Sequence, residues 1–404
     1  DKRKEWLKNY NKDSFIDVKD TKEISYSDFI HKDLIHFSIY DNKRSIPNIC
    51  DGLKPSQRKI LFTLLNRADN EIKVAQLSGY VSAETSYHHG EVSLQQAIIN
   101  MAQDFVGSNN INLLEPLGSF GSRFSGGSDA ASPRYIFTKL RDITRILYPK
   151  IDLNLLPEQI DEGKIIEPEY FLPIIPMILV NGVSGIGTGF STSIPMYNPK
   201  DIISIIFDKL NGKKSKTPLI PWYQSFKGEI SQETDHTYSA KGIINKISSK
   251  KYEITELPIG TYVTPYKDFL ESLDILSNVS NLTTDENHDV KFVIEFKIEP
   301  KKTDDLTKIL KLCKSLSTNN MHLFTTDCTP KKYDTPYEII DEYFSLRLQL
   351  YENRRLKIIA TLENEISLLS EKMRFIQGYL DNKITLHHKK LVEIKPYNLL
   401  IPLL

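Results

Sequence analysis

Apolar and polar residues change their spacing several times along the chain, and each spacing predicts a different kind of element. Between residues 55 and 105 the apolar residues recur at helical spacing. We expect three helices, with starts near Lys54, Ile72 and Glu91, and the second of them is short and ends near Leu77. The Gly- and Ser-rich stretch 118–132 then predicts turns around short strands. Three helices followed by a β-rich wing are typical of a winged-helix domain, which we place at residues 25–160.

The regions on either side of this domain have a different pattern of apolar and polar residues. Residues 1–24 are polar and charged and predict a linker. Segments 251–257 and 290–298 alternate apolar and polar residues, as half-buried strands do. Together with frequent Pro and Gly breaks they predict a second, mixed α/β domain over residues 161–334. The expected fold class is therefore α+β.

The C-terminal region, residues 335–404, predicts a long helical arm. Neither Pro nor Gly occurs between Pro336 and Gly378, which allows one helix roughly 60 Å long. Seven apolar residues alternate at spacings of three and four: Ile359, Leu362, Ile366, Leu369, Met373, Ile376 and Leu380. Such a seam favours a coiled coil, but a seam this short can also pack against its own chain. Periodicity alone leaves both interpretations open.

Composition and cysteine usage narrow the class of protein. Of the 404 residues, 40% are hydrophobic and 26% are charged, as in ordinary soluble proteins. No apolar run is long enough to cross a membrane, and the charged N-terminus does not resemble a signal peptide. The three cysteines suggest neither a disulfide framework nor a zinc site, so we expect an intracellular location.

The distribution of charge indicates a nucleic-acid partner more strongly than the net charge does. The net charge is zero, which by itself argues mildly against nucleic acid. Locally, however, residues 43–59 carry five basic side chains and one acid, and residues 123–150 carry six basic side chains and two acids. Two such basic stretches are compatible with DNA binding, although they are also compatible with solvated faces.

The segment around Tyr135 holds the candidate chemistry. Pro133 favours an extended conformation for the residue before it. Arg134 and Tyr135 are neighbours, so their side chains would diverge on a strand and could converge on a turn. A tyrosine beside an arginine is common, and this spacing alone does not establish a nucleophile.

Ten segments resemble eukaryotic-type DNA topoisomerase II, a type IIA enzyme, in the family's own order. They are residues 25–30, 44–47, 51–59, 73–77, 87–91, 105–110, 132–138, 179–182, 185–189 and 254–258. The resemblance covers nearly the whole chain. The bacterial gyrase branch is less similar, because its histidine motif is spaced differently from Tyr87-His88-His89-Gly90.

This resemblance implies a DNA-cleaving site. Tyr135 would attack a backbone phosphate and form a 5′-phosphotyrosyl link, and Arg134 would stabilise the transition state. Phenols ionise only at about pH 10, so the nucleophile needs help. His89, or less favourably His88, would hydrogen-bond the scissile region or relay a proton. A helix-capping or core role is the alternative for the two histidines.

The resemblance also implies contacts that hold the duplex. The expected DNA-contacting residues are Arg44, Lys54, Tyr87, His88, Ser93 and Asn109, with Arg3 and Lys4 at the entrance. For Arg3 and Lys4, a solvated terminus is an equally good interpretation. Such contacts position DNA without reading its sequence.

Ile186 matches a residue that wedges between base pairs and bends the DNA. Glycines on both sides of it would let the backbone approach the minor groove. Without the resemblance, Ile186 would be interpreted as a core residue.

The resemblance places the cofactors outside this chain. Mg²⁺ and ATP would bind parts of a full-length enzyme that precede it, so no metal ligands are expected here and the chain alone should be inactive. The arm would be truncated before the exit gate. The expected partners are double-stranded DNA and a second copy in a homodimer, without a membrane. Abundant Lys, Asn and Ile suggest a protist or a large DNA virus. We therefore expect a location in the nucleus if the protein is cellular, and in the host cytoplasm or a virus factory if it is viral.

Two rival functions remain. A non-catalytic architectural DNA-bending protein would need the winged helix and Ile186, but has no reason to keep Arg134 beside Tyr135. A structural coiled-coil scaffold would explain only residues 337–380.

Overall fold

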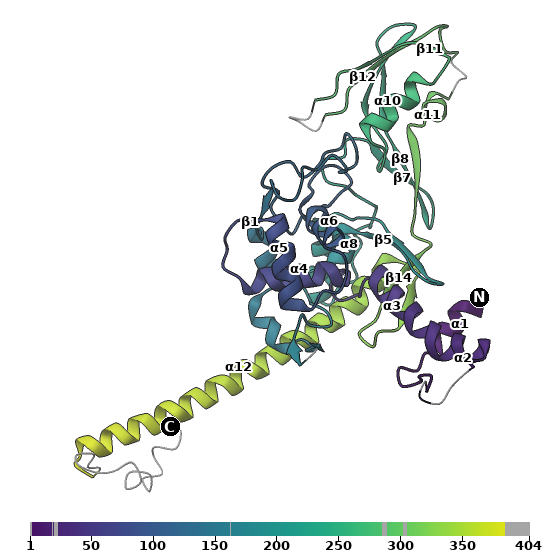
Figure 1. Ribbon diagram of the computed structural model, residues 1–404. Coiled ribbons are helices and arrows are strands. Elements are labelled where there is room, and N and C mark those ends of the chain that lie inside the picture. The colour runs from purple at the N-terminus through teal and green to yellow at the C-terminus, as the bar shows by residue number, and fades with distance from the viewer. Residues whose placement is uncertain are drawn as a thin grey trace. The chain divides into compact units, whose positions relative to one another are not determined.

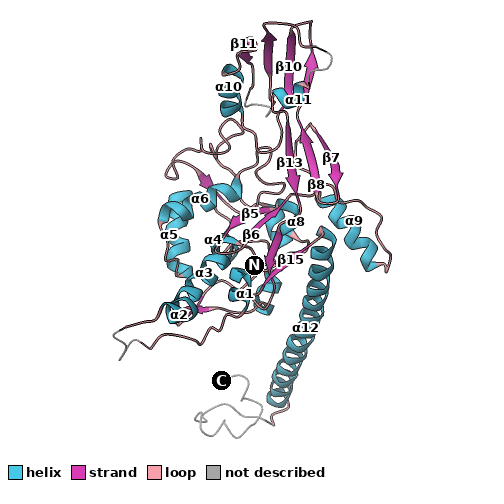
Figure 2. Ribbon diagram, turned by 90° about the vertical axis from the view of Figure 1, so that its right-hand side faces the viewer, coloured by secondary structure: helices cyan, strands magenta, loops and turns pink. Residues whose placement is uncertain are grey.

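The computed structural model describes residues 2–17, 19, 23–161, 163–284, 289–301 and 305–383. The chain divides into two compact units, residues 1–346 and residues 347–404. The first unit mixes helices with small antiparallel sheets (Figures 1 and 2).

The helices of the first unit that are eight residues or longer are α3 (Ile35–Ser45), α4 (Pro55–Asn66), α5 (Val74–Thr85), α6 (Glu91–Ala102), α9 (Pro199–Leu210) and α10 (Val263–Glu271). Its shorter helices are α1 (Lys2–Lys8), α2 (Tyr26–Phe29), the π-helix η1 (Ile30–Leu34), α7 (Asp142–Leu147), the 3-10 helix η2 (Lys150–Leu155), α8 (Met177–Asn181) and α11 (Leu306–Ile309). A last helix, α12 (Pro336–Leu380), starts in this unit.

In the part of the chain that the structure describes, the strands form six antiparallel sheets. The two-stranded pairs are β1 (Ile72–Lys73) with β2 (Phe137–Thr138), β3 (Ile160–Asp161) with β4 (Lys164–Ile165), β5 (Val183–Ile186) with β6 (Ser191–Ile194), and β14 (Met321–Phe324) with β15 (Pro330–Tyr333). The larger sheets have the orders β13 (Cys313–Ser317), β8 (Thr237–Lys241), β7 (Glu229–Thr234), and β11 (Leu276–Asn281), β12 (Phe292–Phe296), β10 (Lys251–Glu256), β9 (Ile243–Lys246).

Helices α4, α5 and α6 pack against one another, as Figure 1 shows. Helix α4 begins as predicted, with Pro55 in its first turn and the backbone N–H of Lys54 donating to Oε1 of Gln57 at 2.9 Å. The predicted second helix starts two residues late, because Ile72 and Lys73 pair with β2 instead. It then continues to Thr85, well past the expected end at Leu77.

The linker predicted for residues 1–24 is wrong for the first of them. Residues 2–8 form helix α1, and Leu7, at 1% exposure, packs in a core cluster with Ile39 and Phe190. One leucine within a charged stretch is too little to show as periodicity in the sequence. Its burial depends on side chains from distant segments.

The two strands predicted from alternation are confirmed. Strand β10 pairs antiparallel with β12, and the inward residues Ile254, Phe292 and Ile294 are fully buried. They form a hydrophobic cluster with residues of helix α10, which is drawn beside this sheet in Figure 2. The alternation identified the buried face correctly because one face of each strand meets a core.

In the second unit, the described residues from Arg347 continue helix α12. The uninterrupted helix predicted after Pro336 is confirmed, and it ends at Leu380. Its seam residues are exposed, from 39% at Ile359 to 66% at Met373. Among the described residues, the chain therefore does not cover its own seam. The rest of the arm, residues 384–404, lies outside the described residues.

Candidate active site and nucleic-acid interface

Tyr135 lies on a turn that is anchored to the start of helix α5. The backbone N–H of Tyr135 donates to the Ser132 carbonyl at 2.9 Å, and the Pro133 carbonyl accepts from Ala75 N–H at 3.1 Å. The neighbouring Ile136 is buried and fixes the segment against the fold. The turn therefore has a fixed base, while the tyrosine side chain itself is 71% exposed.

Arg134 and Tyr135 converge rather than diverge. The guanidinium carbon of Arg134 lies 5.9 Å from the centre of the Tyr135 ring. Of the two geometries that the sequence allowed, the structure has the turn. An exposed phenol beside an exposed guanidinium is an arrangement that can present both groups to an anionic substrate.

The Tyr87-His88-His89 segment follows the other end of helix α5. It begins after Ser86, whose φ of 48° is left-handed and ends the helix. The Tyr87 ring meets His89 edge-on at 5.4 Å, and His88 Nε2 lies 3.5 Å from an Asp161 carboxylate oxygen. Both histidines are exposed and neither is a helix-cap residue, so the core and capping interpretations are wrong.

The surroundings of His89 favour its neutral form. Its partial burial lowers its pKa below the usual value, and the positive charges of Arg44, His88 and Lys59 lower the pKa further. A neutral imidazole has one N–H donor and one acceptor nitrogen, which suits proton relay better than charge neutralisation.

The structure does not bring Tyr135 and His89 of one chain together. Their segments lie at opposite ends of α5, whose 12 residues span roughly 18 Å. In the described part of the chain, no hydrogen bond joins the Tyr135 side chain to another residue. A proton relay between these two side chains within one chain therefore has no geometric support.

Ile186 is 84% exposed at the end of strand β5, so its interpretation as a core residue is wrong. The adjacent glycines have a role that the sequence did not reveal. A Cβ at Gly185 would overlap the Ser45 carbonyl oxygen, and one at Gly187 would overlap Oδ1 of Asn42. These glycines let the β5–β6 hairpin approach helix α3, which leaves the isoleucine projecting from a supported base.

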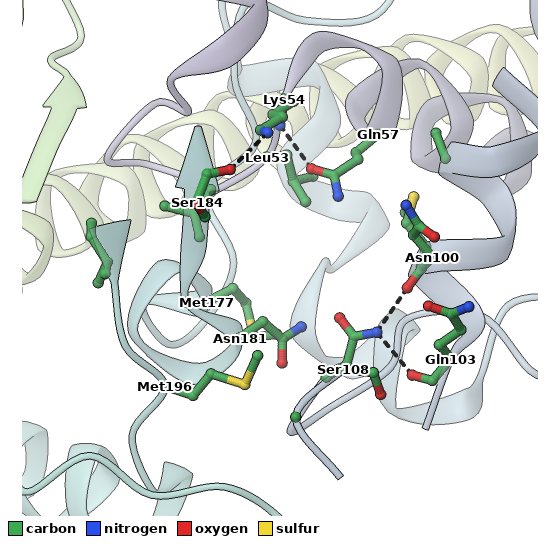
Figure 3. Close-up of a pocket in the computed structure, with 18 of the residues that line it drawn as sticks. Leu53, Lys54, Gln57, Asn100, Gln103, Ser108, Met177, Asn181, Ser184 and Met196 are labelled. Atoms are coloured by element: carbon green, nitrogen blue, oxygen red, sulfur yellow. Dashed lines mark hydrogen bonds between the residues drawn. The ribbon is translucent and has the colours of Figure 1, made fainter. Parts of the chain in front are cut away.

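Three hydrogen bonds that involve side chains of α3 and of the start of α4 hold the same hairpin. Asn42 Nδ2 donates to the Thr188 carbonyl at 2.9 Å, and Thr188 Oγ1 donates to an Asp41 carboxylate oxygen at 3.0 Å. Lys54 Nζ donates to the Ser184 carbonyl at 3.0 Å, as Figure 3 shows. The hairpin therefore depends on α3 and on the start of α4.

Arg3 and Lys4 lie beside the turn of this hairpin. The Arg3 side chain packs against Gly189, and the Lys4 ammonium lies 5.5 Å from the centre of the Phe190 ring. The two residues belong to helix α1, in which Leu7 is buried, while Arg3 itself is exposed and Lys4 is half-buried. The structure therefore places Arg3 and Lys4 beside the hairpin that carries Ile186.

A cavity of about 1150 Å³ is lined by residues from the start of α4, from the hairpin and from α6. Figure 3 shows Lys54, Gln57, Asn100 and Ser184 around it. Lys54 is the one basic residue of its lining, and burial lowers the pKa of this amine. The other lining residues are mostly amide, hydroxyl and apolar side chains. The amides and hydroxyls among them can hydrogen-bond to a sugar–phosphate backbone without adding charge.

Ser93 and Asn109 both line this cavity, but they differ in what they can offer. Ser93 is exposed near the start of α6. Asn109 Nδ2 donates to the carbonyls of Asn100 and Gln103, each at 2.8 Å. Since both amide hydrogens are used internally, Asn109 has no side-chain donor left for a phosphate.

Much of the basic charge counted in the sequence is neutralised within the fold. Arg58 forms a buried ion pair with Asp51 at 2.7 Å, and Arg123 forms one with Glu256. Lys59, Lys139 and Arg145 also pair with carboxylates. In contrast, Arg44, Lys54 and Arg134 form no ion pair in the described part of the chain. The basic residues left without an ion pair therefore include the expected DNA contacts Arg44 and Lys54.

Across the described ranges, no three His, Cys, Asp or Glu side chains gather as a metal site would require. Within these same ranges, no helix is long and apolar enough to cross a membrane.

Comparison with known proteins identifies the family. Residues 44–395 match the family model of the A subunit of DNA gyrase/topoisomerase IV, so the chain belongs to that family. Residues 1–42 match a second model, the C-terminal associated domain of TOPRIM. The second match begins with helix α1 and includes most of α3, which agrees with the docking of α1 on this region.

Within this family, the chain is similar to eukaryotic DNA topoisomerase 2. It is 46% identical to the Plasmodium falciparum protein over 96% of this chain and 28% of the relative, and 45% identical to the Arabidopsis thaliana protein over 97% and 27%. The chain thus spans little more than a quarter of these relatives.

A solved structure agrees. The P. falciparum topoisomerase II DNA-binding, cleavage and re-ligation domain matches with a TM-score of 0.89 and 45% identity, over 97% of this chain and 55% of that one. The mixed α/β fold is therefore that of this domain.

Tyr40 and Asn42 were missed in the sequence, although they contact His89 and the hairpin of Ile186. One signal was present, because Tyr40 is four residues before Arg44 and shares its helical face. No local signal pointed to Asn42, whose partner lies 146 residues away.

Proposed function

We propose that this chain is the breakage–reunion region of a type IIA DNA topoisomerase. It binds duplex DNA, cuts both strands transiently, lets another duplex pass and reseals the break, which relaxes and decatenates DNA. The observation that carries the proposal is the exposed Tyr135 on an anchored turn beside the unpaired guanidinium of Arg134. The likeness to a cleavage and re-ligation domain over 97% of the chain supports it.

In the proposed reaction, the phenolic oxygen of Tyr135 attacks a backbone phosphorus. A bond from phosphorus to the tyrosine oxygen forms as the bond to the 3′ oxygen breaks. The phenol releases a proton and the departing 3′ oxygen takes one up from solvent. The 5′-phosphotyrosyl ester conserves the bond energy, so the 3′ hydroxyl can reverse the step. Arg134 donates hydrogen bonds to the phosphoryl oxygens as their charge increases.

Cutting both strands requires two copies of Tyr135 on one duplex, so the working unit is a two-fold homodimer. The segments of Tyr135 and His89 are separated by the length of α5, roughly 18 Å, and this limits how the two residues can share one site. Within one chain, Tyr135 and His89 address different places on the DNA. We propose that Tyr135 of one protomer acts on the phosphate that the partner's Arg44 and the partner's His89 hold.

The remaining contacts position and bend the duplex. Arg44 and Lys54 bind phosphates, with Tyr87, His88 and Ser93 as further contacts and with Arg3 and Lys4 near the hairpin. Ile186 inserts between base pairs from the supported hairpin, because an exposed apolar side chain gains burial only on binding. Asn109 acts indirectly, since its amide shapes the loop beside the cavity.

In domain terms, we propose that α4, α5 and α6 with β1 and β2 form the winged helix. The mixed α/β domain predicted over residues 161–334 is the tower domain, and it contains the sheets β13-β8-β7 and β11-β12-β10-β9. Helix α12 forms the coiled-coil arm. The described residues do not fit a magnesium site. We propose that the dependence on Mg²⁺ and ATP belongs to other parts of a full-length enzyme, and no step here is assigned to them. A nuclear location in a cell remains a prediction.

The architectural alternative would use the same hairpin and bend DNA without cutting it. It offers no role for an exposed Tyr135 beside an unpaired Arg134. The two functions differ in one measurable respect, which is a covalent protein–DNA link.

The test compares the full-length protein with its Tyr135→Phe variant. Supercoiled plasmid is incubated with each protein and Mg²⁺, and denaturant then traps any covalent complex. We expect the variant to lose nicked and linear products and to bind DNA as before, because only the attacking oxygen is removed. Tyr26→Phe, which changes a tyrosine of 89% exposure on α2, is the matched control and should cleave normally. Adducts that persist in Tyr135→Phe would refute the assignment.

A further inference from the structure

His89 is held from outside its own segment by Tyr40. Tyr40 belongs to helix α3, and its hydroxyl lies 2.5 Å from His89 Nε2. The two ring centres are 6.0 Å apart, and Tyr87 contacts the same imidazole edge-on. A hydrogen bond therefore joins α3 to the histidine that is expected to hydrogen-bond the scissile region.

The chemistry of the two groups decides which one donates. A phenol O–H is a good donor, and its oxygen is a weaker acceptor because its lone pair is delocalised into the ring. The unprotonated nitrogen of a neutral imidazole is a strong acceptor. The favoured arrangement is therefore Tyr40 O–H donating to Nε2. The proton of the imidazole must then reside on Nδ1.

The surrounding charges reinforce this arrangement. The ionisable groups that face His89 are Tyr40 and Arg44 from α3, Lys59 from α4, and Tyr87 and His88 from its own segment. Asp161 of β3 pairs with His88 and offsets part of that positive charge. Burial and the charges of Arg44, His88 and Lys59 lower the pKa of His89.

We propose that Tyr40 is a positioning residue: it donates to Nε2 of His89, fixes the imidazole proton on Nδ1, and so makes Nδ1–H the donor that His89 presents to a DNA phosphate. The catalytic part of this proposal rests on the proposed function. The tautomer itself does not, because it follows from the Tyr40–His89 contact alone.

A second tyrosine–histidine pair supplies an internal reference. Tyr10 OH lies 3.1 Å from Nδ1 of His36, whose Nε2 lies 2.7 Å from the Ser14 carbonyl oxygen. A carbonyl only accepts, so His36 must carry its proton on Nε2. The two histidines should therefore show opposite tautomers in one spectrum.

The tautomers are measured by long-range ¹⁵N–¹H correlation spectra of the 404-residue chain at neutral pH. His89→Gln and His36→Gln assign the two signals among the nine histidines. We expect His89 mainly as Nδ1–H and His36 as Nε2–H. In Tyr40→Phe, His89 should change to the Nε2–H form that a free imidazole prefers, while His36 stays unchanged. Tyr10→Phe is the matched control and should leave His89 unchanged. A wild-type His89 in the Nε2–H form, or one unaffected by Tyr40→Phe, would overturn the proposal.

DNA cleavage by the full-length protein tests the functional half. Tyr40→Phe should slow cleavage about 3- to 10-fold, the effect of one hydrogen bond. In the plot of cleavage rate against pH, the acid limb of Tyr40→Phe should move to higher pH. The reason is that loss of a hydrogen bond to the neutral imidazole raises the pKa of His89. Tyr10→Phe should change neither. A tautomer shift without a change in rate or pH profile would refute the positioning role. If even the wild-type protein forms no adduct, the proposed function fails, and the spectra still decide the Tyr40–His89 contact.

Discussion

Replacing Ile186 with alanine should reduce DNA bending without harming the fold. The side chain is 84% exposed in the free protein, so its truncation should change the free energy of unfolding by less than about 0.5 kcal/mol. Insertion between base pairs would bury it. The three carbon groups lost in Ile186→Ala are then worth about 0.8 kcal/mol each, or about 2.4 kcal/mol.

This free energy corresponds to a roughly 50-fold fall in the ratio of bent to straight complexes, since 1.4 kcal/mol is a factor of ten. Affinity should fall less than this ratio, because the straight complex keeps the phosphate contacts of Arg44 and Lys54. Fluorescence energy transfer between dyes at the two ends of a short duplex measures the bend. Titration of the same duplex measures the affinity.

The matched control is Ile298→Ala, the same substitution at 81% exposure, at a position that the proposal does not assign to DNA binding. It should leave both the bend and the affinity unchanged. If Ile186→Ala bends DNA as the wild type does, the wedge role is refuted. If it unfolds at lower temperature while Ile298→Ala does not, the side chain has a structural role that its exposure conceals.

Two further predictions concern assembly. A heterodimer of one Tyr135→Phe chain and one His89→Ala chain should nick one strand at nearly the wild-type rate if Tyr135 works with the partner's His89, because one complete site remains. Nicking as slow as in the His89→Ala homodimer would show instead that both groups serve the same site in one chain. The 404-residue chain alone should form a weak dimer that DNA stabilises. Its dimer contact would lie at the surface where the cut duplex opens, and a contact that opens in every cycle cannot be tight. Sedimentation over a concentration series checks this, and a chain that stays monomeric on DNA at high concentration would contradict it.

Local patterns in the sequence predicted those elements whose stability is local. Pro55 and the apolar face after it gave the start of α4, alternation gave β10 and β12, and the absence of Pro and Gly gave α12. In each case the signal lies within the segment itself, so no knowledge of distant residues was needed.

The errors have a common physical cause, which is pairing between distant residues. Helix α5 starts late because Ile72 and Lys73 pair with a strand 65 residues further along. Arg123 counted as surface charge in the sequence, but it pairs with Glu256 in the interior. The buried residues that share a cluster with Leu7, among them Ile39 and Phe190, lie outside residues 1–24.

The candidate site was predictable in part. The resemblance named Tyr135, Arg134 and Ile186, and the structure gives each the exposure that its proposed role requires. The sequence could not show that Tyr135 and His89 lie at opposite ends of α5, or that Tyr40 holds the histidine. Both facts depend on tertiary geometry rather than on residue types.

The central claim is that Tyr135 forms a covalent bond with DNA, and mapping that bond tests it most directly. The full-length protein is trapped on DNA with denaturant, digested with nuclease and protease, and the modified peptide is sequenced by mass spectrometry. The account predicts a single nucleotide-bearing peptide that contains Tyr135, joined to a 5′ phosphate. A link at another residue, a link to a 3′ phosphate, or no link under conditions in which DNA is cut would contradict it.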